Sequence, residues 1–277
     1  MLDRYAVIGN PIGHSKSPVI HREFARQTGQ EMEYDRILGS TDGFTRDAGR
    51  FFDQGGLGLN VTVPFKEQAW QYADELSPRA QHARAVNTLI KMTDGRIRGD
   101  NTDGVGLIRD LDENHGLNLR GTHILLLGAG GAARGVLKAL LETDPAALVI
   151  SNRTASKAQE LANHAEGLGP VSGCGLDALH GSKFDLIINA TSAGLDGRLP
   201  EIPKNCLVAG GCTYDMFYGS DPTPFCRWGE AHGAGTILDG LGMLVEQAAE
   251  SFFLWRGVRP NTGPVIDSLR HTALRKT

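Results

Sequence analysis

The chain has 277 residues, with 28 Lys and Arg against 32 Asp and Glu, and its formal net charge is −4. This length suits two domains better than a single domain of about 100–150 residues. The balance of charges, without a basic arm or block, argues against a nucleic-acid partner.

The start of the chain and its apolar segments bear on where the protein works. The first residues carry an acid at Asp3 and only a short apolar run, which is not typical of a signal peptide. The longest apolar stretch, 124–133, contains three glycines and is too short to span a bilayer. We therefore expect a soluble cytoplasmic protein with no membrane partner.

The first hundred residues alternate short apolar segments with segments of helical periodicity. Strands are expected at 5–8, 34–38, 57–63 and 88–92, and helices at 18–27, 41–52 and 66–72. Pro18 after Ser17 fits the residue preferences of a helix start, with Ser17 as N-cap. Alternation of this kind predicts an α/β layered domain.

A second α/β block begins near Thr122. Its expected strands are 123–127, 147–151, 184–189 and 206–209, and its expected helices are 132–141 and 156–165. Two further helices are expected at 241–255 and 263–273, the first with apolar residues recurring every three or four positions. The pattern allows these helices to return to the first domain, and we place the domain boundary around 104–106.

The sequence 128–133 (GAGGAA) matches G-x-G-x-x-A between an expected strand and an expected helix. This context separates a dinucleotide-binding fingerprint from a chance cluster of glycines. Gly128 permits the tight turn, Gly130 lets the backbone approach a pyrophosphate, and the helix start offers free N–H groups. The alternative is a plain glycine-rich turn, which the flanking elements make less favoured.

The turn after the next strand indicates which dinucleotide binds. An NAD site places Asp or Glu there to bind the ribose 2′-hydroxyl. Here the strand is followed by Asn152, Arg153 and Thr154, with no acid. Arg153 can pair with a 2′-phosphate, Thr154 can add a donor, and Lys157 adds positive charge. The sequence favours NADP, although Arg153 alone could be an ordinary surface residue.

The first polar motif of the N-terminal domain is GHSKSP at 13–18. Its serines, Ser15 and Ser17, lie beside a helix start, where hydroxyls and N–H groups suit a carboxylate. A simple serine turn with a helix cap explains the same residues without any ligand.

Two further polar motifs follow later strands. Asn60 and Thr62 share one face of an expected strand, and Lys66 comes after it. Asn87 precedes a GDNTDG stretch that contains Asp103, which could equally be a helix N-cap. Together these residues supply partners for a polyhydroxylated acid and a Lys–Asp pair. Such a pair suits chemistry beside a nicotinamide, because hydride addition to a ketone leaves an alkoxide that needs a proton.

These motifs together resemble the shikimate dehydrogenase family, in order and over nearly the whole chain. The segments that carry the resemblance are HSKSP at 14–18, NVTVPFK at 60–66, AVNT at 85–88, GDNTDGVG at 99–106, GAGGAAR at 128–134, NRT at 152–154, NATSAG at 189–194, YDMFY at 214–218 and DGLGMLVEQAA at 239–249. The similarity is greatest to the NADP-dependent enzymes that serve chorismate formation.

The resemblance implies an α/β fold of two domains with an active-site cleft between them. It predicts a substrate-binding and catalytic domain at 1–104 plus 240–277, and a Rossmann-type NADP-binding domain at 105–239. The implied reaction is the reversible reduction of 3-dehydroshikimate to shikimate by NADPH, in aromatic amino-acid biosynthesis. The implied partner is the small-molecule substrate, shikimate or 3-dehydroshikimate, and the chain would be a monomer or a homodimer.

The resemblance also implies roles for individual residues. Lys66 and Asp103 would be the catalytic pair, with Lys66 as the main proton carrier. The implied substrate-binding residues are Ser15, Lys16, Ser17, Asn60, Thr62, Lys66, Asn87, Asp103, Tyr218 and Gln247. The implied cofactor-binding residues are Gly128, Ala129, Gly130, Gly131, Ala132, Asn152, Arg153, Thr154, Ala155, Ser156, Lys157, Met216 and Gly240. Tyr218, Gln247 and Gly240 rest on the resemblance alone.

The four cysteines, Cys174, Cys206, Cys212 and Cys226, form no C-x-x-C pair and lack metal-site spacing. We expect small buried thiols in a reducing compartment and no metal. Cys212, near the expected nicotinamide side, could alternatively be a modifiable thiol.

Three other functions remain open. One is a quinate/shikimate dehydrogenase using NAD, or an aminoshikimate-type relative. An acid after Arg153 would favour NAD, but Thr154 and Ala155 follow it. A methylene-tetrahydrofolate dehydrogenase shares the two-domain plan and a catalytic lysine, but it does not need the paired serines. A non-catalytic NADP-binding regulator could lose Lys66 or Asp103, and both are present.

Overall fold

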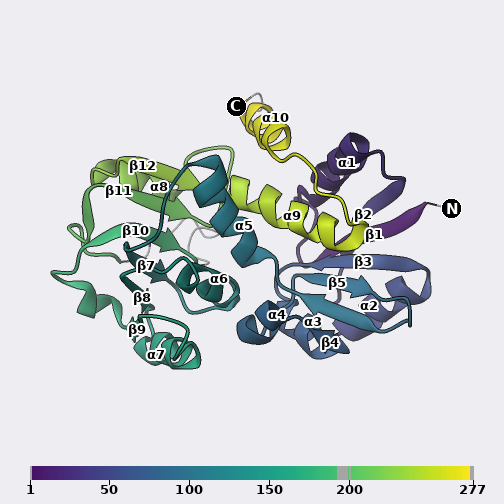
Figure 1. Cartoon of the computed structure of the whole chain (residues 1–277), viewed down its shortest axis with the longest axis horizontal. Helices are drawn as coiled ribbons and strands as arrows, with labels where there is room; N and C mark the ends of the chain where they lie inside the picture. Colours follow the sequence, from purple (N-terminus) through teal and green to yellow (C-terminus); the bar gives the residue numbers. More distant parts are fainter. Residues whose placement is uncertain (1, 192–198, 200, 275–277) are drawn as a thin grey trace. The chain divides into compact units, whose positions relative to one another are not determined.

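The computed structural model describes residues 2–191, 199 and 201–274 (Figure 1). The chain forms two compact units. Unit 1 comprises residues 1–106 and 244–267, and unit 2 comprises 107–243 and 268–277. Residues 192–194 of the NATSAG segment lie outside the described residues.

Unit 1 is built on a six-stranded mixed sheet with the order β2-β1-β3-β5-β6-β4. Its strands are β1 (Asp3–Gly9), β2 (Met32–Leu38), β3 (Gly56–Val61), β4 (Glu75–Leu76), β5 (Thr88–Lys91) and β6 (Ile97–Asp100). β1 pairs in parallel with β2 and β3, whereas β5 runs antiparallel to β3 and β6. The carboxyl end of β3 therefore lies next to the start of β5, which brings Asn60 level with Thr88.

The helices of unit 1 connect these strands. They are α1 (Ser17–Thr28), α2 (Phe44–Asp53), α3 (Lys66–Tyr72) and α4 (Pro78–Ala83). α5 (Asp103–Arg109) begins in unit 1 and ends in unit 2, and α9 (Leu241–Arg256) begins in unit 2 and ends in unit 1.

Both faces of the unit 1 sheet are buried at β1, because neighbouring side chains of a strand point to opposite faces. Ala6 and Ile8 lie in a core cluster with phenylalanines of α2. Tyr5 and Val7 lie in a second cluster, against which Trp255 of α9 packs. The C-terminal helix α9 thus completes the core of unit 1.

Unit 2 is built on a six-stranded, fully parallel sheet with the order β12-β11-β10-β7-β8-β9. Its strands are β7 (His123–Leu127), β8 (Ala147–Ser151), β9 (Val171–Cys174), β10 (Phe184–Asn189), β11 (Leu207–Asp215) and β12 (Thr236–Asp239). Counted within the unit, this is the doubly wound 3-2-1-4-5-6 order of the Rossmann fold. The predicted α/β class with a Rossmann-type unit is confirmed.

Helical segments connect the strands of unit 2 (Figure 1). They are α6 (Gly131–Leu141), α7 (Ala155–His164), α8 (Pro224–Ala231), a π-helical turn η1 (Asp110–Asn114) and a 3₁₀ turn η2 (Leu176–Leu179). The last helix, α10 (Gly263–Leu274), reaches unit 2 through Arg270, which bonds to Asp239 at 2.9 Å. The order β10-β7 marks the point where the strand order reverses, at the carboxyl end of β7.

Long apolar strands form where the sequence places them, at 123–127, 147–151 and 184–189. Among the described residues, nine elements of at most eight residues were not expected from the sequence: β4, β6, β9, β12, α4, α5, α8, η1 and η2. Segments this short do not show enough periodicity to be recognised. The strand expected at 206–209 extends to Asp215, through a run of small residues that the hydrophobic pattern does not mark.

Three local predictions in the N-terminal part are wrong. Ser17 is the first residue of α1 rather than its N-cap, because Ser15 Oγ already accepts its N–H at 3.3 Å and Lys16 is the N-cap. Thr62 does not share a strand face with Asn60, because β3 ends before it. The helix expected from residue 41 starts at 44, since the preceding residues form a turn.

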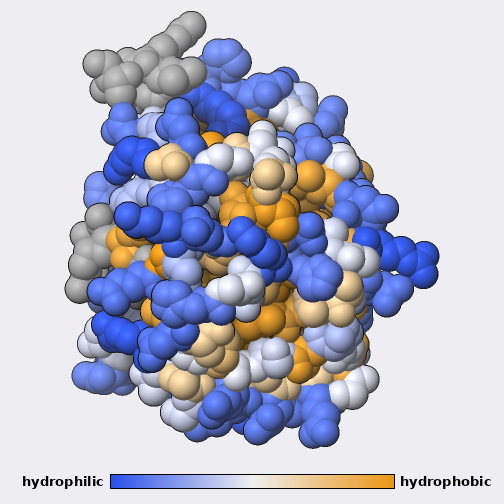
Figure 2. Space-filling view, turned by 90° about the vertical axis from the view of Figure 1, so that its left-hand side faces the viewer, coloured by the Kyte–Doolittle hydropathy of each residue, from blue (hydrophilic) through white to orange (hydrophobic). Residues whose placement is uncertain are grey.

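The surface mixes hydrophilic and hydrophobic residues, as the face shown in Figure 2 illustrates. The large apolar side chains that are well exposed are Leu2, Val19, Leu38, Val63, Leu199, Ile237 and Phe253. Single exposed apolar residues are normal on folded proteins. Among the described residues, no helix combines the length and the hydropathy that crossing a membrane requires.

Candidate active site

Lys66 and Asp103 form an ion pair in unit 1, with 2.6 Å between Lys66 Nζ and Asp103 Oδ2. Lys66 is the first residue of α3 and Asp103 the first of α5. Asn87 Nδ2 donates to the other carboxylate oxygen of Asp103 at 2.8 Å. The Lys66 side chain is 21% exposed and that of Asp103 7%. The carboxylate is therefore held from two sides, and Lys66 is the more exposed member of the pair.

The backbone around Lys66 is fixed by buried neighbours. Phe65 is fully buried, and its N–H donates to the carbonyl of Thr62 at 3.0 Å. The carbonyl of Lys66 accepts the N–H of Val86 at 2.9 Å, next to Asn87. The start of α3 is thereby tied to the loop that carries Asn87, which explains why two motifs far apart in the sequence meet.

Gln247 of α9 joins this group from the other end of the chain. Its Oε1 lies 3.2 Å from Asn87 Nδ2 and 3.3 Å from Thr102 Oγ1. Asn87 Oδ1 in turn accepts the Thr102 N–H at 2.9 Å. The sequence alone did not single out Gln247, but the structure places it among the predicted polar residues.

Asn60 is buried, and its amide group is engaged within the protein. Its Oδ1 accepts the Tyr34 hydroxyl at 2.7 Å, and its Nδ2 lies 3.2 Å from Thr88 Oγ1 and 3.0 Å from Ser251 Oγ. Sequence reasoning missed Tyr34, Thr88 and Ser251. The available signals were that Ser251 lies four residues after Gln247 on one helix and that Thr88 follows Asn87 directly.

The paired serines lie together at the start of α1. Ser15 Oγ and Ser17 Oγ are 3.2 Å apart, and the guanidinium of Arg36 donates two hydrogen bonds to the carbonyl of Ser15, at 2.6 and 3.1 Å. Lys16 between them is half-buried. Arg36, which the sequence analysis did not select, holds the serine turn in place.

Tyr34 connects the serine turn to Asn60. Burial raises the pKa of the Tyr34 hydroxyl well above its usual value, and a hydrogen bond with Ser17 acts in the opposite direction. The ring of His21 stacks on Tyr34 with centroids 4.2 Å apart. Burial lowers the pKa of His21 to about 3, so this imidazole is neutral near pH 7. Tyr34 and His21, which pack next to Asn60, are therefore both uncharged near pH 7.

Thr62 and Tyr218 are less closely tied to these residues. Thr62 is half-buried, and its methyl group lies where Gly9 would carry a Cβ, which explains the glycine there. Tyr218 belongs to unit 2, where burial, followed by the charge of Asp239, raises the pKa of its hydroxyl.

The glycine turn of unit 2 follows β7 and fits a dinucleotide. Gly128 has φ +102°, and its N–H donates to the carbonyl of Ser151 at 2.8 Å. A Cβ at Gly128 would lie 3.1 Å from the carbonyl oxygen of Ala190, whereas a Cβ at Gly130 would meet nothing within 4 Å. The backbone at Gly130 is thus open to a ligand at the start of α6, where free N–H groups attract phosphate.

The turn after β8 offers positive charge without an acid. Arg153 and Lys157 are exposed, and neither forms an ion pair within the described part of the chain. Asn152 Nδ2 donates to the carbonyl of Thr154 at 3.0 Å and holds the turn in shape. Ala155 then begins α7. This donor set fits the 2′-phosphate of NADP better than the free 2′-hydroxyl of NAD.

Met216 and Gly240, both expected near the cofactor, are in direct contact. A Cβ at Gly240 would lie 2.2 Å from the carbonyl oxygen of Met216, and the Gly240 N–H donates to the carbonyl of Phe217 at 3.1 Å. Only glycine permits this approach. Asp215 beside them is fully buried and accepts the Thr223 hydroxyl at 2.6 Å, and burial raises its pKa.

Cys206 and Cys212 are buried thiols. Burial raises the pKa of Cys212 to about 12 and that of Cys206 to about 11. Both thiols therefore stay protonated at neutral pH, which supports a structural role for Cys212. Among the described residues, no group of three or more His, Cys, Asp and Glu side chains could hold a metal ion.

Three segments of the chain match family models of shikimate dehydrogenases. Residues 7–89 match the shikimate dehydrogenase substrate binding domain, 110–195 match shikimate / quinate 5-dehydrogenase, and 240–270 match the shikimate 5′-dehydrogenase C-terminal domain. Two similar curated relatives are the shikimate dehydrogenases (NADP(+)) of Cellvibrio japonicus and Methylococcus capsulatus. They are 56% and 58% identical, and the alignments cover 98% of both chains for the first and 96% of both for the second.

Solved structures are also similar to the chain. An Ael1 enzyme from Pseudomonas putida has a TM-score of 0.89 and 48% identity, covering 96% of this chain and 98% of that one. A shikimate 5-dehydrogenase from Thermus thermophilus, solved with NADP(H) and shikimate, has a TM-score of 0.86 and 32% identity, covering 99% and 100%.

Proposed function

We propose the residue roles below from one premise: this chain belongs to the shikimate dehydrogenase family. It is an NADP-dependent oxidoreductase that reversibly reduces 3-dehydroshikimate to shikimate, a step of chorismate and aromatic amino-acid biosynthesis. We assign the substrate to the predicted domain 1–104 plus 240–277, and NADP to the predicted domain 105–239. We further propose a cytoplasmic location, a monomer or homodimer, and no nucleic-acid partner.

The Lys66–Asp103 pair, 2.6 Å apart and held by Asn87, carries the proposed mechanism. Reduction of a ketone places negative charge on its oxygen, and a positioned acid stabilises that charge by donating a proton. Lys66 is the partly exposed member of the pair and is therefore the proposed proton donor to the C3 oxygen. In the oxidative direction its neutral amine accepts the same proton.

Asp103 has a different task in this mechanism. Its two oxygens bond to Lys66 and Asn87, so the carboxylate fixes the direction in which the ammonium group points. It also offers an acceptor to a substrate hydroxyl. Bound NADPH supplies the hydride. The chain's own residues therefore hold the ketone, orient it and provide the proton.

The other polar groups of unit 1 suit the remaining parts of the substrate. Ser15 and Ser17, 3.2 Å apart, can both donate to a carboxylate. Asn87 and Gln247 lie beside the catalytic pair and suit ring hydroxyls. We propose that Asn60 supports Asn87, because Asn60 Nδ2 donates to the carbonyl of Asn87 and to Thr88 Oγ1. Lys16, Thr62 and Tyr218 keep the substrate-binding role that the family resemblance implies.

The proposed cofactor site follows the same logic in unit 2. The turn from Gly128 to Ala132, with its backbone open at Gly130, suits the pyrophosphate at the start of α6. Asn152 to Lys157 suits the 2′-phosphate through Arg153 and the hydroxyls of Thr154 and Ser156. Met216 and Gly240 keep their predicted place beside the nicotinamide.

The direct test is NADPH formation at 340 nm from shikimate and NADP, with NAD and quinate as alternative reactants. Turnover with shikimate and NADP, and far slower turnover with either replacement, is the expected result. Preference for NAD would overturn the role given to Arg153. Preference for quinate would overturn the assignment of the substrate.

A further inference from the structure

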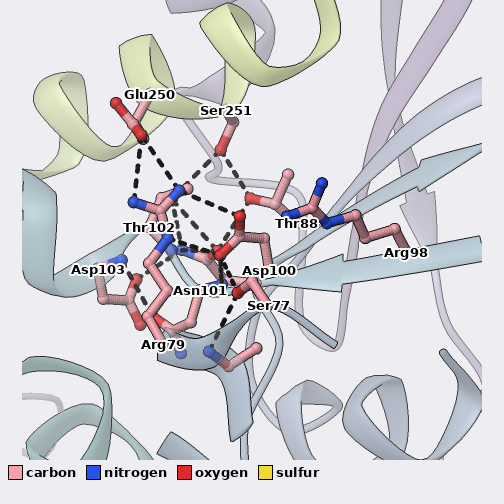
Figure 3. Close-up of polar contacts among 12 residues, drawn as sticks. Ser77, Arg79, Thr88, Arg98, Asp100, Asn101, Thr102, Asp103, Glu250 and Ser251 are labelled. Atoms are coloured by element: carbon pink, nitrogen blue, oxygen red, sulfur yellow. Dashed lines mark hydrogen bonds and ion pairs between the residues drawn. The ribbon is translucent and has the colours of Figure 1, made fainter. Parts of the chain in front are cut away.

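Asp100, at the end of β6, is a buried carboxylate that the mechanism above does not use. It is 2% exposed, and its Oδ1 accepts the Ser77 hydroxyl at 2.5 Å, Arg79 Nε at 2.6 Å and the Asn101 N–H at 2.7 Å. Its Oδ2 accepts Arg79 Nη2 at 3.1 Å. Arg79 thus binds both oxygens, the fork geometry that an arginine side chain favours with a carboxylate (Figure 3).

The guanidinium of Arg79 has a second acidic partner, Glu250 of α9. Arg79 Nη1 and Nη2 both lie 3.1 Å from Glu250 Oε1. The other oxygen of Glu250 accepts Arg259 Nη2 at 2.6 Å. Two acids and two arginines alternate in this cluster, so its charges balance. The Asp100 and Glu250 side chains are only 3% and 10% exposed.

Asp100 is also the first residue of a segment that ends at the catalytic Asp103. The carbonyl of Asp100 accepts the Asn87 N–H at 3.0 Å. Asn101 Oδ1 accepts the Asp103 N–H at 3.1 Å, and Asn101 Nδ2 donates to the carbonyl of Ala85 at 3.0 Å. Moving Asp100 would therefore move Asn87 and Asp103 with it.

Helix α9 meets this segment at two points. Gln247 and Glu250 are three residues apart, which places them on one face of the helix. Gln247 bonds to Asn87 and to Thr102, while Glu250 bonds to Arg79. Figure 3 shows Glu250 on α9 facing Arg79, with Asp100 on the other side of the guanidinium. The bond of Glu250 to Arg79 therefore fixes α9 about one helical turn away from Gln247.

We propose, on the basis of the function proposed above, that Arg79, Asp100 and Glu250 are positioning residues for the reaction. None of them contacts substrate or cofactor in this proposal. Their ion-pair bridge sets the distance between α9, which carries Gln247, and the 100–103 segment, which carries Asp103. This distance places the groups that bind the substrate hydroxyls correctly relative to Lys66, the proposed proton donor.

Two physical arguments favour positioning over a purely stabilising role. A buried ion pair is weak support for stability, because apolar side chains of similar volume often serve as well. A bidentate guanidinium bridge, in contrast, fixes both distance and angle. Catalysis is sensitive to such geometry, since a misplacement of about 1 Å can cost about 100-fold in rate.

The test uses Glu250→Gln, which keeps shape and removes the charge that binds Arg79. Asp3→Asn is the matched control, because Asp3 is the acidic partner of Arg256 at the far end of the same helix. We expect Glu250→Gln to raise KM for shikimate about tenfold and to lower kcat several-fold, with KM for NADP unchanged. The control should lower the thermal midpoint and leave all three constants as in the wild type.

A second variant, Arg79→Lys, keeps the charge and loses the fork, and it should show the same selective loss. Shikimate affinity by calorimetry gives a readout independent of turnover. A KM for shikimate that stays at the wild-type value in both variants would overturn the proposal, and so would global unfolding of both at the assay temperature. A wild-type enzyme that does not turn over shikimate would instead refute the proposed function.

Discussion

Each unit carries one candidate binding site, and the two sites are built from different kinds of groups. In unit 2, the glycine turn that begins at Gly128 leads directly into α6, and its backbone is open at Gly130. In unit 1, Lys66, Asn87, Asp103 and Gln247 come from four separate segments and meet through side-chain hydrogen bonds. A backbone site depends on the absence of side chains, whereas a side-chain site depends on every supporting contact.

This difference predicts how substitutions in each site affect the enzyme. Changes in the unit 1 group should affect turnover, because the reacting atoms meet there. Changes in the unit 2 turns should affect NADP affinity and leave shikimate affinity nearly constant.

The largest effect is expected from Asp103→Asn, which keeps the shape of the side chain and removes its charge. Lys66 then loses the carboxylate 2.6 Å away that orients it. We expect kcat to fall about 100- to 1,000-fold, the range typical of general acid–base groups. Initial rates at 340 nm provide the measurement. Asp94→Asn is the control, because Asp94 is an exposed partner of Arg96 in the same unit and should have no effect.

A smaller effect is expected from Arg153→Ala in unit 2. Hydrogen bonds to charged groups contribute about 1.5–3 kcal/mol, which corresponds to roughly 10- to 100-fold in affinity. KM for NADP should rise by that factor, while KM for NAD and kcat stay nearly unchanged. Arg120→Ala removes an exposed arginine that pairs with Asp144 in the same unit, and it serves as control. Equal losses for NAD and NADP would contradict the assignment to the 2′-phosphate.

Gly130→Ala separates ligand approach from protein packing. A Cβ there meets no protein atom within 4 Å, so the thermal midpoint should stay within about 2 °C of the wild type. The methyl group would occupy the space proposed for the pyrophosphate, and KM for NADP should rise about tenfold. Normal NADP binding by this variant would contradict the assignment of Gly130 to the cofactor site.

The smallest effect concerns pH and the buried core of unit 1. His21 is fully buried with a pKa lowered to about 3, below its value near 6.5 in an unfolded chain. The unfolded state therefore binds a proton that the native state does not, and stability falls as pH drops below about 6.5. Between pH 7.5 and 6 the loss should be roughly 1 kcal/mol, increasing further toward pH 3. Urea unfolding of His21→Phe, which keeps a stacking ring, should show less of this loss than the wild type.

The same contrast explains how much could be predicted from the sequence. The NADP turn could be derived from residues alone, because its chemistry lies in three glycines within four residues, between a strand and a helix. A Lys66–Asp103 pair was predicted from the residue types and their motifs, whereas Gln247 depended entirely on the family resemblance. Residue identity alone does not show that Asn87 and Gln247, 160 positions apart, meet in the fold.

What the sequence could not indicate is the support behind the site. Arg79 and Glu250 look like ordinary charged residues of helices, yet Arg79 binds the buried Asp100 and Glu250, only 10% exposed, binds Arg79. The end of β3 before Thr62 was also not visible, because the alternating pattern continues past the last paired residue. Both cases depend on tertiary packing, which overrides local pattern.

The most direct test of the central claim is kcat and KM of Lys66→Ala with shikimate and NADP, with shikimate affinity measured in parallel. If Lys66 is the proton carrier, kcat should fall by about 100-fold or more while shikimate affinity changes little. A kcat close to that of the wild type, with only KM for shikimate raised, would show that Lys66 merely binds the substrate and would contradict the account.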